Sequence, residues 1–539
     1  MTILRLLLLA ALPLLATPAP APPPAGAVSI VVDANVERRA ISPLIYGVAF
    51  ADAAALRDLG APLNRSGGNS ASLYNWQADA RGAGRDWFFE TLPCTPDQDA
   101  CFTGERFATA TRAGGAAAIL TLPMTGWVAQ PGPRGERRAA FSVGRYGPQQ
   151  RTDRDFAEAG NGVRPDGKEI VGNDPHDAAR PADVAFQRGW VEALVGRFGR
   201  AERGGVAYYA LDNEPSLWFE THRSVRPVAP HASEIADNTI AYAAMVKRVD
   251  PSAKVLGPEE WGWNGYRYSG FDIQHSYTHG FDDAPDRATE TGGMDYVPWL
   301  LTRWKQAGRP VDVVSLHYYP QGGEYDADKP DVSPTMQARR NRSTRSLWDP
   351  AYVDQSWIND RVALIPRMRG WVDRYYHPGT PIAITEYSWG AEGSMNGATA
   401  QADVLGIFGR EGLDMATRWV VPPRGSPVWF AMKLYRNPDG LGGGFGETSV
   451  AAHAPDPDTV ATFAALRRDG ALTIVAINKR ADASARIALA IRGFASAGTI
   501  GGYRLAEGRL STLPVARYAG SRIAATLPAQ SVTLFVLTA

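Results

Sequence analysis

The sequence predicts an α/β fold, a TIM-like (β/α)8 barrel with an additional β-sandwich domain. Three observations support this class. Short apolar, β-branched runs alternate with segments of helical spacing over residues 42–444, which is the pattern of parallel strands joined by helices. The runs end in segments rich in Gly, Asn, Trp and Glu, as at the carboxyl face of a barrel. After Phe445, alternating runs follow one another without helices, which is typical of an antiparallel domain.

Eight runs have the length and composition of buried barrel strands. They are Leu44–Phe50, Ala61–Arg65, Ala117–Leu122, Val206–Leu211, Lys254–Gly257, Val311–His317, Pro381–Glu386 and Val428–Leu434. On this count Glu214 follows the fourth strand and Glu386 ends the seventh.

Between the strands, apolar residues recur at helical spacing, as at Trp190, Val191 and Leu194. The predicted helices are Asp52–Leu59, Arg106–Gly114, Gln187–Phe198, Ser233–Val249, Tyr296–Gln306, Thr399–Glu411, and one or two helices within Tyr352–Tyr376 interrupted at Pro366. Residues 131–181 are rich in Asn, Gly and Asp, so we predict a long loop there. Long loops inside compact domains are usually functional or held by a metal.

The remaining segments divide the chain into four parts. Residues 1–27 have a basic residue, a short leucine-rich core and a small-residue end, which predicts a signal peptide and a secreted or periplasmic protein. Residues 28–41 contain a strand that we expect to join the β-sandwich, and residues 42–444 form the barrel. Residues 445–539, with a turn at Asp469-Gly470, form the sandwich. No low-complexity linker separates the two domains, so we expect them to pack rigidly.

Charge and cysteine content limit the partners. Lys plus Arg and Asp plus Glu each number 56, so nothing favours nucleic acid or an anionic membrane as partner, and we expect a monomer. Cys94 and Cys101 are the two cysteines; they either close a small disulfide loop or are free thiols. Their spacing excludes a CxxC zinc site. Many of the 15 tryptophans lie in polar segments, which favours stacking on flat ligands such as sugars.

Two glutamates at strand ends suggest one active site. Pro215 cannot extend a ladder, so Glu214 lies at the end of its strand, and Glu386 ends a second apolar run in the same way. Two carboxyl groups facing each other across a sugar are the minimum equipment for hydrolysing a glycosidic bond. A single carboxylate after a strand could equally be an ordinary loop residue.

The neighbours of the two glutamates suggest different roles. Arg65, His317 and Tyr319 leave other strands and can stabilise an ionised Glu386, which we therefore assign as nucleophile. Glu214 has a less cationic neighbourhood and suits the acid/base that holds its proton. His317 could alternatively be a structural donor at a strand end.

Several motifs closely resemble glycoside hydrolase family 44 over residues 64–450. They include SGGNSASLYNWQ, YYALDNEPSLWFETH, SLHYYPQG, AITEYSWGAEG and VLGIFGREGLDMAT. The resemblance implies a barrel with a β-sandwich and retaining endo-β-1,4-glucanase or xyloglucanase activity on β-1,4-glucan polysaccharides. It also implies that no cofactor is required for the chemistry and that a structural Ca²⁺ is possible.

The resemblance carries site residues over by motif. Glu214 in DNEP is the acid/base and Glu386 in ITEY the nucleophile, with Asn213, His317 and Tyr319 positioning them. Further substrate-binding candidates are Arg65, Asn69, Trp76, Trp261, Trp348 and Trp389. Each tryptophan could instead pack at the barrel top. Glu90, Asp153 and Asp155 lie in the segments that match calcium ligands, although their spacing is not that of an EF-hand and a solvated loop is the alternative.

The substrate stays open at this stage. The chain departs from the family pattern at Ser66, Ser224, Ser388 and Gln355, and mannan, xylan or mixed-linkage glucan are alternatives. A non-catalytic polysaccharide-binding protein is the alternative from another class. A retaining mechanism predicts carboxyl groups about 5 to 5.5 Å apart, whereas a separation near 8 Å would exclude it.

Overall fold

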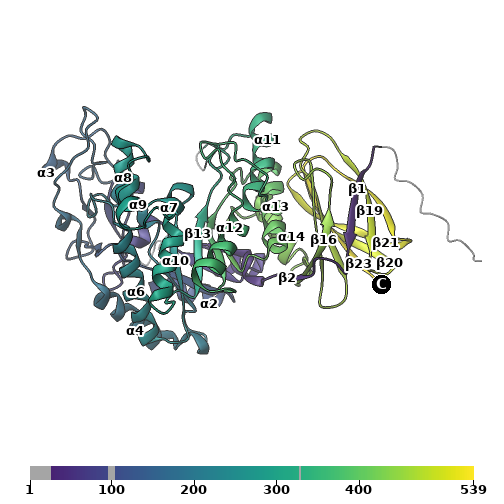
Figure 1. The fold of residues 1–539 in the computed structure, drawn as a ribbon, viewed down its shortest axis with the longest axis horizontal. Coiled ribbons are helices and arrows are strands. Elements are labelled where there is room, and N and C mark those ends of the chain that lie inside the picture. Colours follow the sequence, from purple (N-terminus) through teal and green to yellow (C-terminus); the bar gives the residue numbers. More distant parts are fainter. Residues whose placement is uncertain (1–25, 95–103, 327–328) are drawn as a thin grey trace, which may run out of the picture.

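A computed structural model describes residues 26–94, 104–326 and 329–539. The helix-covered barrel and the strand domain lie side by side along the long axis of the molecule (Figure 1). Most of the predicted signal peptide lies outside the described residues. Cys101 also lies outside them, so the prediction for Cys94 and Cys101 falls partly beyond the described chain. In the described part of the chain, no helix combines the length and apolar character needed to cross a membrane.

Eight parallel strands close the barrel, because the last of them pairs with the first. In chain order they are β3 Gly47–Ala49, β4 Leu63–Ser66, β7 Ala117–Leu122, β11 Tyr208–Leu211, β12 Lys254–Glu260, β13 Val313–Tyr318, β14 Ile382–Tyr387 and β15 Met415–Arg418. Inward-facing apolar side chains such as Leu63, Ile119 and Leu256 fill the centre, so the barrel is a packed core and its chemistry lies at the strand ends.

Helices surround the barrel. The longer ones are α1 Ala53–Leu59, α2 Gly104–Ala113, α4 Val184–Phe198, α6 Ala232–Val249, α8 Gly270–His279, α10 Tyr296–Gln306, α11 Pro334–Ser343, α12 Leu364–Trp371, α13 Met395–Glu411 and α14 Pro427–Arg436. Short ones are α5 Trp218–Thr221, α7 Trp263–Arg267 and α9 Pro285–Thr289, whereas the short α3 Val143–Tyr146 lies in the insertion of residues 131–181. Asp52, Asp183 and Ser394 each accept a backbone N–H of the first turn, which defines where α1, α4 and α13 begin.

Two element predictions are wrong in detail. Val428–Leu434, predicted as the eighth strand, lies in α14, which Ser426 caps and Pro427 begins. Its buried residues follow helical spacing, so an apolar run was mistaken for a strand. The true eighth strand, β15, is short and ends in the buried Arg418. Pro366 does not interrupt its helix, because it lies in the first turn of α12, where its missing N–H costs no hydrogen bond.

The strand domain combines both ends of the chain. Its strands are β1 Val28–Asp33, β2 Arg39–Ala40, β16 Thr448–His453, β17 Val460–Leu466, β18 Leu472–Asn478, β19 Ala485–Arg492, β20 Ala497–Ala506, β21 Arg509–Ala519, β22 Arg522–Leu527 and β23 Ser531–Thr538. The N-terminal β1 runs parallel to β19 and antiparallel to β16, and Figure 1 shows it in purple among the yellow strands. Side chains from one end and from the middle of the strand order, such as Ile30 of β1, Leu489 of β19 and Ile474 of β18, share one core.

Helix α13 joins the two domains. An added Cβ at Gly406 would come 2.2 Å from the Phe463 ring, so the glycine permits close packing of α13 on β17. Lys479 of the strand domain forms a buried ion pair of 2.7 Å with Asp403 of α13. The domains are therefore fastened by both apolar and charged contacts.

Residues 131–181 form mostly irregular structure, as predicted, around a small core that includes Phe89, Phe141 and Ile170. Two small sheets tie this insertion to the barrel top. One contains β5 Ala80–Gly82, β6 Glu90–Pro93 and β9 Arg138–Ala139, and the other contains β8 Trp127–Ala129 and β10 Ala179–Pro181.

Candidate active site

Glu214 leaves the carboxyl end of β11 in a strained turn. Its φ of 45° is left-handed, a conformation that costs a non-glycine residue on the order of 1 kcal/mol. Its backbone N–H donates to the Glu259 carbonyl at 3.0 Å, across to β12. Pro215 then begins a short 3-10 turn. The strand end and the neighbouring strand together fix where the Glu214 side chain starts.

Glu386 lies within β14 and is held from two sides. The Arg65 guanidinium, at the end of β4, donates from Nη1 to Glu386 Oε1 at 2.6 Å. The Tyr319 hydroxyl donates to Oε2 at 2.9 Å. Burial and the adjacent Glu386 raise the pKa of Tyr319 well above its ordinary value, so the hydroxyl keeps the proton that it donates. These contacts hold the Glu386 carboxyl group in a defined orientation beside a cation.

His317 connects the two carboxyl groups. Its Nδ1 lies 2.8 Å from Glu214 Oε1 and 3.6 Å from Glu386 Oε2. One carboxyl oxygen of each glutamate and one imidazole nitrogen lie within 4.8 Å of one another. Burial alone would lower the pKa of His317, but Glu386, Glu214 and Glu259 together raise it to about 9. The ring is therefore a cation near neutral pH, and it donates from both nitrogens.

Arg65 joins the site to a third glutamate that sequence reasoning missed. Its Nη2 donates to Glu259 Oε2 at 3.0 Å and to Asn213 Oδ1 at 3.2 Å. Burial would raise the pKa of Glu259, but Arg65 and His317 lower it to about 2. The fully buried Glu259 thus balances the positive charge of Arg65 and His317.

Glu214 has the opposite electrostatic tendency from Glu259. Burial raises its pKa, the His317 hydrogen bond opposes this, and the charge of Glu386 adds to it. Behind it, Glu260 is fully buried and accepts from the Ser216 hydroxyl at 2.6 Å. Burial raises the pKa of Glu260 to about 8. The Glu214 side of the cluster therefore favours protonated carboxyl groups.

A groove lies next to the cluster, on the side of Asn69. Asn69 accepts from Asn213 Nδ2 at 3.3 Å and donates to both carboxylate oxygens of Asp86 at 3.1 Å. Asp86 lines a cavity of about 1040 Å³ between the 84–89 segment, the insertion and helices α5 and α8. Trp87 and Tyr277 line it and are 47% and 62% exposed. Sequence reasoning missed both aromatic residues, because their segments carry no barrel-strand signal.

Of the predicted tryptophans, Trp261 lies near the cluster. It directly follows Glu260, and its ring faces Trp357 at 6.5 Å between centroids. The Trp357 indole donates to Gln321, which donates in turn to the Tyr319 carbonyl. Trp357 is 51% exposed and was missed, since it lies in a loop far from any strand in sequence. The pair offers two neighbouring aromatic rings on the side of Tyr319.

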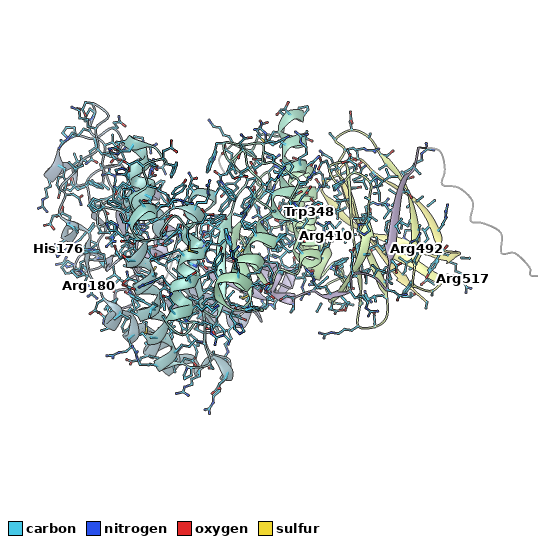
Figure 2. The ribbon with its side chains drawn as sticks, viewed as in Figure 1. His176, Arg180, Trp348, Arg410, Arg492 and Arg517 are labelled. Atoms are coloured by element: carbon cyan, nitrogen blue, oxygen red, sulfur yellow. The ribbon has the colours of Figure 1, made fainter. Side chains whose placement is uncertain are left out.

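The other three predicted tryptophans are placed elsewhere. Trp76 donates to the Phe186 carbonyl at 3.1 Å and packs near helix α4. Trp389 is 2% exposed and donates to Ser343, so its ring is not free to stack on a ligand. Trp348 lies under the Arg410 guanidinium, 4.3 Å from the ring centroid, in a cavity between the domains, and Figure 2 shows both residues beside the strand domain. Packing at the barrel top or at the interface accounts for all three.

The predicted metal ligands are only partly brought together. Glu90 and Asp153 are both buried, and both contact the guanidinium of Arg137. Asp155 is 65% exposed at its side chain and pairs with Arg154. The acidic pair therefore already holds a cation that belongs to the chain.

The strand-end cluster can divide one reaction between two carboxyl groups. Glu386 is oriented by a guanidinium and a hydroxyl group, burial raises the pKa of Glu214, and a groove with exposed aromatic rings lies beside both. In a (β/α)8 barrel, this combination defines the class of glycoside hydrolases with a carboxyl pair.

Comparison with known proteins specifies the family. The sequence model of glycoside hydrolase family 44 matches residues 80–322. The crystal structure of CelM2, a bifunctional glucanase-xylanase from a metagenome library, is 49% identical, with a TM-score of 0.91 over 95% of this chain and 99% of that chain. A family 44 xyloglucanase from Paenibacillus polymyxa is 28% identical, with a TM-score of 0.76 over 95% and 99%.

A third relative extends beyond this chain. Endoglucanase A of Paenibacillus lautus is 32% identical over 85% of this chain, and the chain spans 64% of that protein. Together these matches show that the chain belongs to glycoside hydrolase family 44.

Proposed function

We propose that the protein is a retaining endo-β-1,4-glucanase that hydrolyses internal bonds of β-1,4-glucan polysaccharides, xyloglucan among them. The observation that carries this proposal is the pairing of Glu214 and Glu386 around His317, with carboxyl oxygens within 4.8 Å. Such close spacing leaves no room for a water between the carboxylate and the sugar, and so favours direct attack by the carboxylate.

In the first step, a Glu386 oxygen attacks the anomeric carbon while Glu214 donates its proton to the leaving oxygen. The glycosidic bond breaks, a covalent glycosyl ester forms on Glu386, and one end of the cut polymer departs. Arg65 and Tyr319 hold the carboxylate in the attacking orientation. Burial supports the proton on Glu214 before the step by raising its pKa.

In the second step, Glu214 acts as a base. It accepts a proton from water, the water oxygen attacks the anomeric carbon, and the ester bond to Glu386 breaks. The product has the starting anomeric configuration, and both glutamates return to their initial protonation states. The His317 cation stabilises Glu214 while it is ionised between the two steps, because its Nδ1–H donates to Oε1.

The groove supports action on a polymer. Its volume of about 1040 Å³ and its exposed Trp87 and Tyr277 suit several sugar units rather than one. A polysaccharide substrate is also in keeping with export through the predicted signal peptide. Against a purely binding function, both glutamates retain polar supports that binding alone would not require.

Xylan is a second candidate substrate. The relative that is 49% identical is described as a bifunctional glucanase-xylanase, and xylan has the same β-1,4 backbone linkage without the exocyclic hydroxymethyl group. We therefore propose that the groove also accepts xylan.

Azide rescue of two variants tests the mechanism on an aryl β-cellobioside. Glu214→Ala should lose about 10²- to 10⁴-fold in turnover of polymer, and azide should restore aryl-glycoside turnover with a β-glycosyl azide as product. Glu386→Ala should give an α-glycosyl azide, because azide then replaces the nucleophile. Interchanged azide products would reverse the two assignments.

A second experiment defines the substrate. It measures reducing-end release by the wild-type protein from xyloglucan, carboxymethyl cellulose, mixed-linkage glucan, xylan and mannan.

A further inference from the structure

Arg137 bridges two buried carboxylates of the insertion. Its Nε donates to Glu90 Oε2 at 2.8 Å, and its Nη2 contacts both Glu90 Oε2 and Asp153 Oδ2. Glu90 and Asp153 are each 1% exposed. Burial raises the pKa of Glu90 to about 7 although Arg137 opposes the rise, and the guanidinium supplies the positive charge that two buried carboxyl groups need when they ionise.

The bridge connects three separate segments. Glu90 begins β6, Arg137 immediately precedes β9, and Asp153 lies within the insertion beyond α3. The arginine is further ordered by Phe156, whose ring centroid lies 5.2 Å from the guanidinium carbon. A planar guanidinium can bond two carboxylates at once, which a single ammonium group cannot do in the same geometry.

The donor set does not fit a calcium ion. Calcium takes six to eight oxygen ligands at about 2.3 to 2.6 Å, whereas Arg137 occupies the space between the two carboxylates. Asp153 Oδ1 accepts the Asp155 backbone N–H at 3.1 Å, and the Asp155 side chain points to solvent beside Arg154. Of the carboxyl oxygens of Glu90, Asp153 and Asp155, Glu90 Oε1 is the buried one that has no hydrogen-bond partner. A single oxygen cannot form a coordination shell.

The bridge also reaches the groove. The Trp87 indole donates to Asp153 Oδ2 at 3.4 Å, and Trp87 lines the groove beside the catalytic cluster. The Arg137 guanidinium fixes Asp153, and Asp153 in turn fixes Trp87 in the wall of the groove.

We propose that Arg137 takes the place of a divalent cation in this protein. The guanidinium fastens the insertion to the barrel top and makes the stability of the groove wall independent of calcium. This inference does not depend on the proposed hydrolytic activity, because its readout is thermal unfolding.

The first experiment compares the melting temperature of the wild-type protein in EDTA and in about 5 mM calcium, above the range in which weak extracellular calcium modules bind. We expect equal melting temperatures. A higher melting temperature in calcium would overturn the proposal.

The second experiment removes the guanidinium. Arg137→Met should lower the melting temperature by several degrees, because Glu90 and Asp153 then face each other without a cation. The matched control is Arg145→Met in the same insertion, because the Arg145 side chain is 52% exposed and solvent screens its ion pairs with Asp174 and Asp177, which should contribute little. Equal losses in the two variants would overturn the proposal.

A third variant covers the case in which Arg137→Met does not fold. Arg137→Lys keeps the charge but reaches one carboxylate at a time, so it should fold and still melt several degrees below wild type. A wild-type melting temperature for Arg137→Lys would show that bridging is not needed and would overturn the proposal.

Discussion

Glu259 and Glu260 are adjacent at the end of β12, yet their pKa values move in opposite directions. Arg65 and His317 outweigh burial and lower the pKa of Glu259 to about 2, whereas burial raises that of Glu260 to about 8. Glu259 has a left-handed φ of 59° where the pairing of β12 with β13 is irregular, and one carboxyl group there contacts Arg65 while the other contacts Ser216 in the turn that carries Glu214. At neutral pH, Glu259 is therefore ionised and Glu260 is mostly protonated.

Glu260→Gln should change how stability depends on pH. The raised pKa of Glu260 stabilises the fold below its ordinary pKa of 4.5, and this contribution is lost as pH rises towards 8. Glutamine does not titrate and can keep both contacts to Ser216. The variant should therefore gain stability relative to wild type as pH rises from 4.5 to 8, by about 1.4 kcal/mol for each pH unit crossed.

Denaturant unfolding at pH 5 and pH 8 measures this difference. Glu192→Gln on the exposed face of α4 is the control and should show no change in pH dependence. A pH-independent difference between Glu260→Gln and wild type would contradict a protonated Glu260.

His317→Gln should move the basic limb of kcat/KM to higher pH. The His317 cation lowers the pKa of Glu214, so its removal lets that pKa rise, and Glu214 keeps its catalytic proton to higher pH. Loss of a charge-assisted hydrogen bond should also reduce kcat roughly ten- to a hundredfold. Rate profiles between pH 5 and 10 test both effects, and a basic limb that moves to lower pH would refute the assigned role.

Tyr277→Ala should weaken binding of long substrates. An exposed ring that stacks on a sugar contributes about 0.5 to 1.5 kcal/mol, so KM for polymer should rise about two- to tenfold at unchanged kcat. Tyr277→Phe keeps the ring and loses only the contact to Glu220, so its KM should match wild type. Equal effects of both variants would assign the role to the hydroxyl group instead of the ring.

Lys479→Met should lower the free energy of unfolding by weakening the contact between the two domains. It leaves the buried Asp403 carboxyl group without its cation, and among the described residues the Thr344 hydroxyl remains as its donor, at a cost of about 3 to 5 kcal/mol. Urea unfolding measures the loss, and the double variant Lys479→Met/Asp403→Asn should recover part of it. A double variant as unstable as the single one would place the defect elsewhere.

Local patterns were sufficient for most of the architecture. The apolar run before Glu386 and the helical spacing around Trp190 specify their elements, because burial on one face imposes a period on the sequence. The prediction of the eighth strand was wrong. Met415–Arg418 is too short to show a period, and the apolar stretch of α14 is more strand-like in composition than the strand itself.

The candidate site was predictable where chemistry coincides with a strand end. Glu214, Glu386, Arg65 and His317 each occupy such a position, and parallel strands bring those ends together. Glu259 is also at a strand end, but the next residue, Glu260, is a glutamate as well. Which of the two faces the cleft depends on the twist and register of β12, where the pairing with β13 is irregular.

The sequence by itself determined the barrel, the strand domain and the two glutamates at the strand ends, because each rests on contacts or spacing local to the chain. Only the tertiary structure decided which tryptophans border the cleft, which carboxyl groups carry a proton, and that Arg137 lies between Glu90 and Asp153. Stacking surfaces and pKa values depend on groups that are distant in sequence and close in space, and on their shared burial. No local pattern encodes that proximity.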